Sequence, residues 1–175
     1  MNIQSAVIEG TNILKGKSIL SAQLDTEILM AKVLDKNREY IILNHEKALN
    51  IENLEYFKKL VLERATRKPI AYLLNKKLFW KSEFYVNKNT LIPRPDTEII
   101  IEQILKATKH KNYLKILDIG VGSGCILLSI LKEKKNFYGT GIDISKNSLK
   151  ISRLNAKKLF VDERVKFYKS DVDKF

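Results

Sequence analysis

The stretch LKILDIGVGSGCILLSIL, from Leu114 to Leu131, holds three glycines within five residues, between two apolar runs. The run before the glycines is short and apolar, which is typical of a buried β-strand, and the run after them has helical periodicity. Glycines at such a turn let a ligand lie against the backbone, and the next helix begins there with unpaired N–H groups. The stretch therefore predicts a strand, a ligand-binding loop and a helix, in that order.

The residues that follow repeat the alternation of strand and helix. FYGTGIDIS predicts a second buried strand, KNSLKISRLNAKKL a second helix and RVKFYKSD a third strand. Ile99 to Ala107, ahead of the opening stretch, also have helical periodicity. Strands and helices that alternate with short loops favour a parallel α/β sheet, which we expect over residues 93–175.

Residues 1–74 have the pattern of a helical bundle. In SAQLDTEILMAKVLD the apolar residues recur at helical spacing after Ser21, a candidate N-cap, and in NIENLEYFKKLVLERA they do so after Asn50. The residues expected to face the core of this unit are Leu24, Ile28, Leu29, Ala31, Leu34, Leu54, Phe57, Leu60 and Val61. Pro69 interrupts the second pattern. Residues 75–92 are rich in aromatic and β-branched side chains and predict a β-hairpin linker.

Composition excludes several classes of protein. Of the 175 residues, 45% are apolar and 30% charged, which indicates a globular chain with a sizeable core, and no apolar run is long enough to span a membrane. Cys125 has no second cysteine to pair with, and His45 and His110 lack metal-ligand spacing. We therefore expect a cytoplasmic protein without a metal ion or an internal disulfide.

The net charge of +12, from 32 Lys and Arg against 20 Asp and Glu, would suit an anionic partner such as RNA. The lysines are spread along the whole chain, however, so a general compositional bias explains the charge at least as well. We expect no direct binding to nucleic acid.

Two acidic residues accompany the glycine loop. Asp118 ends the strand before the loop, and Asp143 ends the next strand, where a carboxylate can hold both hydroxyls of a ribose. The spacing G-x-G-x-G, with Cys at position 125, differs from the G-x-G-x-x-G of pyrophosphate-binding loops. A tight turn packed against a helix also requires glycine without any ligand, but the order strand, loop, helix, strand and acid favours a nucleotide-like cofactor.

LDIGVGSG followed by GIDIS resembles the first two motifs of class I methyltransferases, which bind S-adenosyl-L-methionine. The resemblance implies that Asp118 lies near the methionine end of the cofactor, that Asp143 holds the ribose and that Ile144 flanks the adenine. KSDV stands where such enzymes contact the adenine ring. The cofactor-binding residues implied in this way are Asp118, Gly120, Val121, Gly122, Ser123, Gly124, Asp143, Ile144, Asp171 and Val172.

Further motifs narrow the resemblance to one family. LIPRPDTEIIIEQIL, RKPIAYLL, LFWKSEFYVN and SAQLDTEILMAKVL are similar to segments of the release-factor glutamine methyltransferases, the PrmC or HemK family. The resemblance implies that the helical unit recognises the substrate and that Arg94, Thr97 and Glu98 lie near the substrate entrance. PRPDTE also has a structural interpretation, in which the prolines stiffen the chain and Asp96 caps the next helix. Asn75 stands where the family usually has glycine.

The resemblance implies transfer of a methyl group to the glutamine of the Gly-Gly-Gln motif in class I peptide chain release factors, without a metal ion. In the family an Asn-Pro-Pro-Tyr motif after the fourth strand holds the substrate amide, and the 175 residues contain no such motif. We therefore expect the first half of a Rossmann-like methyltransferase domain over residues 93–175. We expect this portion to be inactive by itself, and a bare sheet edge to permit its self-association.

Two other functions stay open. A methyltransferase acting on adenine or another planar amine shares the cofactor half, although the helical unit and PRPDTE argue against it. The second is a non-catalytic module that binds a protein or RNA through its helices and basic surface.

Overall fold

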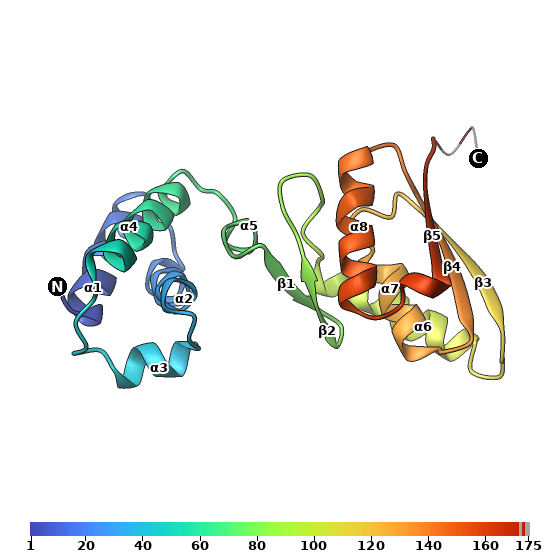
Figure 1. Ribbon diagram of the computed structural model, residues 1–175, viewed down its shortest axis with the longest axis horizontal. Helices are drawn as coiled ribbons and strands as arrows, with labels where there is room; N and C mark the ends of the chain where they lie inside the picture. The colour runs from blue at the N-terminus through green and yellow to red at the C-terminus, as the bar shows by residue number, and fades with distance from the viewer. Residues whose placement is uncertain (172, 174–175) are drawn as a thin grey trace. The chain divides into compact units, whose positions relative to one another are not determined.

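The computed structural model describes residues 1–171 and 173, and the chain divides into two compact units, Met1–Leu74 and Asn75–Phe175 (Figure 1). Each unit has its own hydrophobic core. The first unit consists of helices and their connections, and the second combines a β-hairpin with a parallel sheet and its helices.

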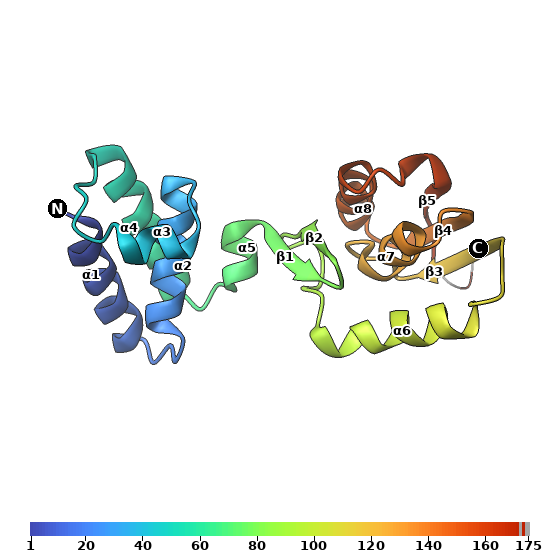
Figure 2. The same cartoon turned by 90° about the horizontal axis from the view of Figure 1, so that it is seen from below.

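Helices α1, α2 and α4 pack against one another in the first unit (Figure 2). The helices of this unit are α1 (Ile3–Gly16), α2 (Ala22–Leu34), α3 (Arg38–Leu43), α4 (Ile51–Ala65) and α5 (Ile70–Leu74). The largest side chains buried between them are Ile3, Leu14, Leu29, Met30 and Phe57. The predicted helical bundle is therefore present.

Helix α4 has the predicted cap and the predicted buried face. The side chain of Asn50 accepts a hydrogen bond of 2.8 Å from the backbone N–H of Asn53, which satisfies one of the unpaired donors of the first turn. The buried residues of this helix are Phe57, Leu60 and Val61. The helix ends before Pro69, which has no N–H to continue it.

The predicted buried face of α2 is wrong in part. Leu24 is 44% exposed, whereas Asp25 is buried. Arg64 of α4 donates from Nε to Asp25 Oδ2 at 2.7 Å, and the Ser21 hydroxyl donates to the same oxygen at 2.9 Å instead of capping the backbone. A buried carboxylate is tolerated only when it is paired in this way, and the partner lies on another helix, so the spacing within α2 could not reveal it.

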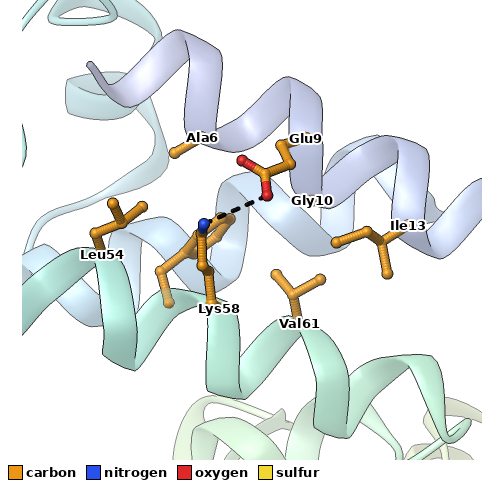
Figure 3. A pocket seen from close by; sticks show the side chains of 8 residues that line it. Ala6, Glu9, Gly10, Ile13, Leu54, Lys58 and Val61 are labelled. Carbon is orange, nitrogen blue, oxygen red and sulfur yellow. Dashed lines mark ion pairs between the residues drawn. The ribbon is translucent and has the colours of Figure 1, made fainter. Parts of the chain in front are cut away.

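Gly10 lets α1 lie close to its neighbours. A Cβ added there would meet side-chain atoms of Thr26 in α2 and Val61 in α4 at 3.1 Å each. The small hollow beside Gly10, between α1 and α4, is bridged by Glu9 and Lys58, whose charged atoms are 3.4 Å apart (Figure 3). Its volume of about 10 Å³ is at the lower limit for one water molecule, so it is a packing defect rather than a ligand site.

The second unit begins with the predicted hairpin. Strands β1 (Lys76–Phe79) and β2 (Ser82–Tyr85) pair antiparallel, with the turn between them at residues 80 and 81. Phe79 and Phe84 are both buried and meet edge to face, with ring centroids 6.1 Å apart. Because both belong to the core of the second unit, the hairpin is an integral part of that unit rather than a free linker.

Asn75 shows why a glycine suits the position before the hairpin. Its φ is +54°, in the left-handed region that most side chains avoid and that glycine and asparagine tolerate best. Its side-chain amide also lies 3.4 Å from the carbonyl oxygen of Val86, across the entrance of the hairpin. Asparagine is therefore compatible with this backbone conformation, which glycine would also adopt without strain.

The sheet of the second unit contains three parallel strands in the order β3-β4-β5, and the predicted alternation of strands and helices is confirmed. The elements are η1 (Pro95–Thr97), α6 (Glu98–Ala107), β3 (Leu114–Ile119), α7 (Cys125–Glu133), β4 (Phe137–Asp143), α8 (Lys146–Lys158), η2 (Asp162–Arg164) and β5 (Val165–Lys169). The core joins buried residues of α7 and α8 to the sheet and the hairpin. The expected α/β class is therefore correct.

Strand β3 is not buried on both faces, contrary to the expectation from its apolar run. Leu114 and Ile116 pack against the core, but Leu117 and Ile119 are 46% and 55% exposed. Successive side chains of a strand point to opposite faces of the sheet, so the second pair lies on the face away from that core. Among the described residues this second face stays largely uncovered.

Candidate cofactor site

The glycine loop lies between the carboxyl end of β3 and the start of α7, as the sequence predicts. All three of its glycines have positive φ: +76° at Gly120, +55° at Gly122 and +82° at Gly124. A Cβ at Gly124 would in addition lie 2.7 Å from Leu128 Cδ1. At Gly120 it would meet no atom within 4 Å, so the space beside the start of the loop is open to a ligand.

Backbone hydrogen bonds to β4 give the loop its shape. The N–H groups of Gly120 and Val121 both donate to the carbonyl of Ile142 at 2.9 Å, and Gly124 N–H donates to the Val121 carbonyl at 2.7 Å. The backbone donors of Gly120, Val121 and Gly124 are therefore used within the protein itself. The loop is organised before any ligand arrives, which lowers the entropic cost of binding.

Asp143 ties the loop to the next helix. Its Oδ2 accepts a hydrogen bond of 3.0 Å from Gly122 N–H, and its Oδ1 accepts one of 2.8 Å from Ser145 N–H, at the start of α8. A carboxylate has about four acceptor positions, so these two bonds leave capacity for the hydroxyls of a ligand.

Asp118 is the second acidic residue at this edge of the sheet. The pKa of its carboxyl is raised to about 6, mainly because the group is buried; a hydrogen bond from the backbone of Leu127 opposes the shift, and the negative charge of Asp143 adds to it. The carboxyl is therefore poised to ionise near neutral pH, and a cationic group placed beside it would favour the ionised form.

Residues expected at the adenine end also come together. Ile144, Lys169, Ser170 and Asp171 line an open hollow at the carboxyl ends of β4 and β5. The N–H of Ser170 donates to the carbonyl of Asp143 at 3.2 Å, so this hollow adjoins the carboxylate that holds the loop. Val172, which the sequence also assigned to this end, lies outside the described residues.

The PRPDTE segment is tied to the hairpin. Glu98 Oε1 accepts a hydrogen bond of 2.7 Å from the backbone N–H of Trp80, at the hairpin turn. Arg94 is exposed and Thr97 is half-buried. The structural interpretation of Asp96 as a helix cap is wrong: α6 begins at Glu98, and Asp96 lies within the preceding 3₁₀ turn. Pro95 starts that turn, and α6 begins one residue later than a cap at position 96 would require, with Thr97 at the cap position.

Three buried polar side chains of α8 lie behind the loop and were not predicted from the sequence. Ser148, Ser152 and Asn155 are each at most 5% exposed. Their spacing of four and three residues puts them on one face of the helix, which is the only signal in the sequence that could have found them.

The thiol of Cys125, at the first position of α7, is a poor nucleophile at neutral pH. Burial raises the pKa of its thiol to about 11, so it is protonated at neutral pH.

Within residues 1–171 and 173, no group of three or more His, Cys, Asp or Glu side chains is placed to hold a metal ion. In the same part of the chain, no helix combines the length and the apolar character needed to cross a membrane.

Comparison with known proteins identifies relatives for both units. Residues 5–74 match the family described as PrmC N-terminal domain, and residues 109–175 match the family described as methyltransferase domain. A release factor glutamine methyltransferase from Leptospira interrogans is 37% identical over 173 residues, which are 98% of this chain and 60% of that protein. One from Buchnera aphidicola is 42% identical over 81% of this chain and 51% of its own length. A bifunctional methyltransferase from Rickettsia felis is 34% identical over 97% of this chain and 37% of its own length.

The comparisons confirm both the α/β methyltransferase fold and the resemblance to the release factor glutamine methyltransferases. The chain spans 60% or less of the length of the relatives named above.

Proposed function

We propose that the chain supplies the substrate-recognition and cofactor-binding portions of a release factor glutamine methyltransferase. The proposal is supported by the similarity of nearly the whole chain to part of such enzymes and by the match of its first unit to the PrmC N-terminal domain family. The enzyme transfers a methyl group from S-adenosyl-L-methionine to the side-chain nitrogen of the glutamine in the Gly-Gly-Gln motif of class I release factors. That substrate implies action in the cytoplasm.

The observation that carries the proposal is the junction of Asp143 with the glycine loop. An acid at the end of β4 that also bonds the loop backbone is suited to hold the ribose, because ligand and loop then share one carboxylate. We assign Asp118 to the cationic methionine end of the cofactor, and Ile144 and Asp171, which line the hollow, to the adenine. Val172 completes the proposed set of cofactor-binding residues. Arg94, Thr97 and Glu98 stay proposed as residues near the substrate entrance.

The chemistry requires groups beyond the cofactor site. The lone pair of an amide nitrogen is delocalised, so acceptors must hold the amide hydrogens and align the nitrogen with the methyl group. The cofactor supplies the activated methyl group. Residues 1–175 contain no Asn-Pro-Pro-Tyr sequence to provide those acceptors. The 175-residue chain tested alone should therefore bind the cofactor without methylating glutamine.

Calorimetry with S-adenosylhomocysteine and a radiolabelled methyl-transfer assay on a purified release factor test the two halves of this proposal. We expect measurable binding, no methyl transfer by the 175-residue chain, and transfer once the chain is extended to the length of its relatives. Absence of binding would overturn the cofactor assignment, and turnover by the verified 175-residue chain would overturn the assignment of the amide-holding groups.

The substrate is tested separately by binding. A release factor should bind the chain after nuclease treatment, with only a shallow dependence on salt, because the proposed recognition does not depend on phosphate contacts. Binding that is lost with the RNA would favour the nucleic-acid alternative. Methylation of adenine, and not of a release factor, by the extended chain would favour the amine methyltransferase.

A further inference from the structure

Helix α8 presents a row of buried polar side chains to two other parts of the second unit. The row consists of Ser148, Ser152 and Asn155, and the last two are completely buried. A buried polar group is costly unless it is hydrogen-bonded, so the partners of these side chains indicate what the row does.

Ser152 holds the centre of the glycine loop. Its hydroxyl donates to the carbonyl of Gly122 at 2.7 Å, and the alternative acceptor one turn back, the carbonyl of Ser148, lies farther away at 3.2 Å. The N–H of Gly122 is bonded to Asp143. Both polar groups of this glycine are therefore fixed, one from β4 and the other from α8.

Asn155 connects the loop with the hairpin. Its Nδ2 donates to the carbonyl of Ser123 at 2.8 Å and to that of Tyr85 at 3.0 Å, while its Oδ1 accepts from Tyr85 N–H at 2.7 Å. Both amide hydrogens and the amide oxygen are thus satisfied. Farther along the row, the Ser148 hydroxyl donates to the carbonyl of Asn89 at 2.7 Å. One helix therefore holds both the loop and the segment that leaves the hairpin.

The direction of these bonds bears on ligand binding. In a planar trans peptide, the N–H of one residue points opposite to the carbonyl of the residue before it. Since α8 draws the carbonyl of Gly122 toward itself, the N–H of Ser123 points away from α8. The row thereby turns a backbone donor toward the opposite side of the loop.

We propose that Ser152 and Asn155 are positioning residues that hold the glycine loop in its binding conformation, and that Asn155 also couples this loop to the hairpin. The functional part of this inference rests on the proposed cofactor site. If a side chain merely stabilises the unit, its removal makes global unfolding more frequent. If it positions the loop, its removal changes the loop within a protein that stays folded.

Ser152→Ala and Ser129→Ala form a matched pair for the test. Ser129, on α7, is also completely buried, but its hydroxyl has no hydrogen-bond partner among the described residues. Each variant deletes one buried hydroxyl, and only Ser152→Ala frees a loop carbonyl. Amide hydrogen exchange by NMR and the affinity for S-adenosylhomocysteine are measured on both.

We expect Ser152→Ala to speed exchange at the loop amides of residues 120–124 and to weaken binding roughly threefold to tenfold, as for the loss of one hydrogen bond. Exchange elsewhere in the second unit should stay unchanged. Ser129→Ala should alter neither measurement. Asn155→Asp keeps the acceptor for Tyr85 N–H but loses both donors, so it should perturb the loop and the residue 85 amide together.

The two readouts separate this inference from the proposed function. Unchanged loop exchange in folded Ser152→Ala, or a rise spread evenly over the second unit, would overturn the positioning role. If loop exchange rises locally but the unsubstituted chain binds no S-adenosylhomocysteine, the positioning role stands and the proposed function fails.

Discussion

The Asp143 carboxylate accepts a hydrogen bond of 3.0 Å from the backbone N–H of Gly122, which lies 21 residues earlier in the chain. Asp143 ends β4 and Gly122 follows β3, and these two strands are parallel neighbours. Their carboxyl ends therefore meet at one edge of the sheet, which is where parallel α/β sheets bind ligands.

Replacing Asp143 by alanine should weaken S-adenosylhomocysteine binding by about 1.5–3 kcal/mol, the usual contribution of a hydrogen bond to a charged group. Asp162→Ala, which removes an exposed aspartate of the same unit, is the control and should leave binding unchanged. Calorimetry measures both affinities, and circular dichroism checks the fold. Equal affinities in folded variants would overturn the assignment of Asp143 to the cofactor ribose.

Asp118 should make binding of the cofactor dependent on pH. Because the pKa of its carboxyl in the folded chain is raised to about 6, the group is largely protonated at pH 5 and ionised above about 7. The sulfonium and ammonium groups of S-adenosyl-L-methionine favour the ionised form. Affinity should rise as the pH rises through 6, with release of a proton on binding, and calorimetry in two buffers of different ionisation enthalpy measures that proton.

Asp118→Asn should remove this dependence near pH 6. It should also change the stability of the chain without cofactor. The raised pKa means that the folded state binds this proton more tightly than the unfolded state, so the contribution of Asp118 to stability falls as the pH rises from about 4 to about 6. Urea titrations at these two pH values should show a smaller loss in Asp118→Asn, and an identical loss would show that another group titrates there.

The hairpin can be followed through Trp80, the single tryptophan of the chain. Its indole N–H donates to Glu133 Oε1 at 2.7 Å, and the pKa of Glu133 is lowered mainly by its hydrogen bond to Lys81 and then by the bond to Trp80. A lowered pKa means that the stabilisation is present above the ordinary glutamate range and is lost as the pH falls through the folded value.

Trp80 emission should therefore change on acidification only below the ordinary range of glutamate. Glu133→Gln should abolish that step, and Glu52→Gln, at an exposed position of α4, should preserve it. A transition unchanged by Glu133→Gln would assign the fluorescence change to another contact of the hairpin. Fluorescence titration of the three proteins is sufficient for this test.

Local signals in the sequence predicted most elements, and contacts between distant residues explain the failures. The cap at Asn50, the hairpin and the alternation of strands and helices each depend on neighbouring residues or on periodicity. The burial of Asp25 depends on Arg64, 39 residues away, and that of Asn155 depends on Tyr85, 70 residues away. No spacing within one helix encodes such partners.

Some features of the candidate site were likewise predictable from the sequence, and others were not. The acid at the end of a strand and the glycines at the turn follow from residue type and position, so Asp118, Asp143 and the loop were predicted. The hydrogen bond between Asp143 and Gly122, and the bond from Ser152 of α8 to the loop, depend on how β4 and α8 pack. These two contacts could be found only from the structure.

The uncovered face of the sheet should make the 175-residue chain self-associate. Leu117 and Ile119 are about half exposed on β3, and Tyr138 of β4 is exposed on the same face. Strand β3 is one of the two edge strands of the sheet that the described residues form. Apolar side chains next to unpaired backbone groups of an edge strand favour association with another chain.

Sedimentation should detect oligomers that grow with concentration. Leu117→Lys should reduce them, because a charge on that face must be desolvated on contact. Leu62→Lys, at an exposed position of α4, should not reduce them. A chain that stays monomeric at every concentration, or oligomers that both lysines disrupt equally, would show that this sheet face is not the contact.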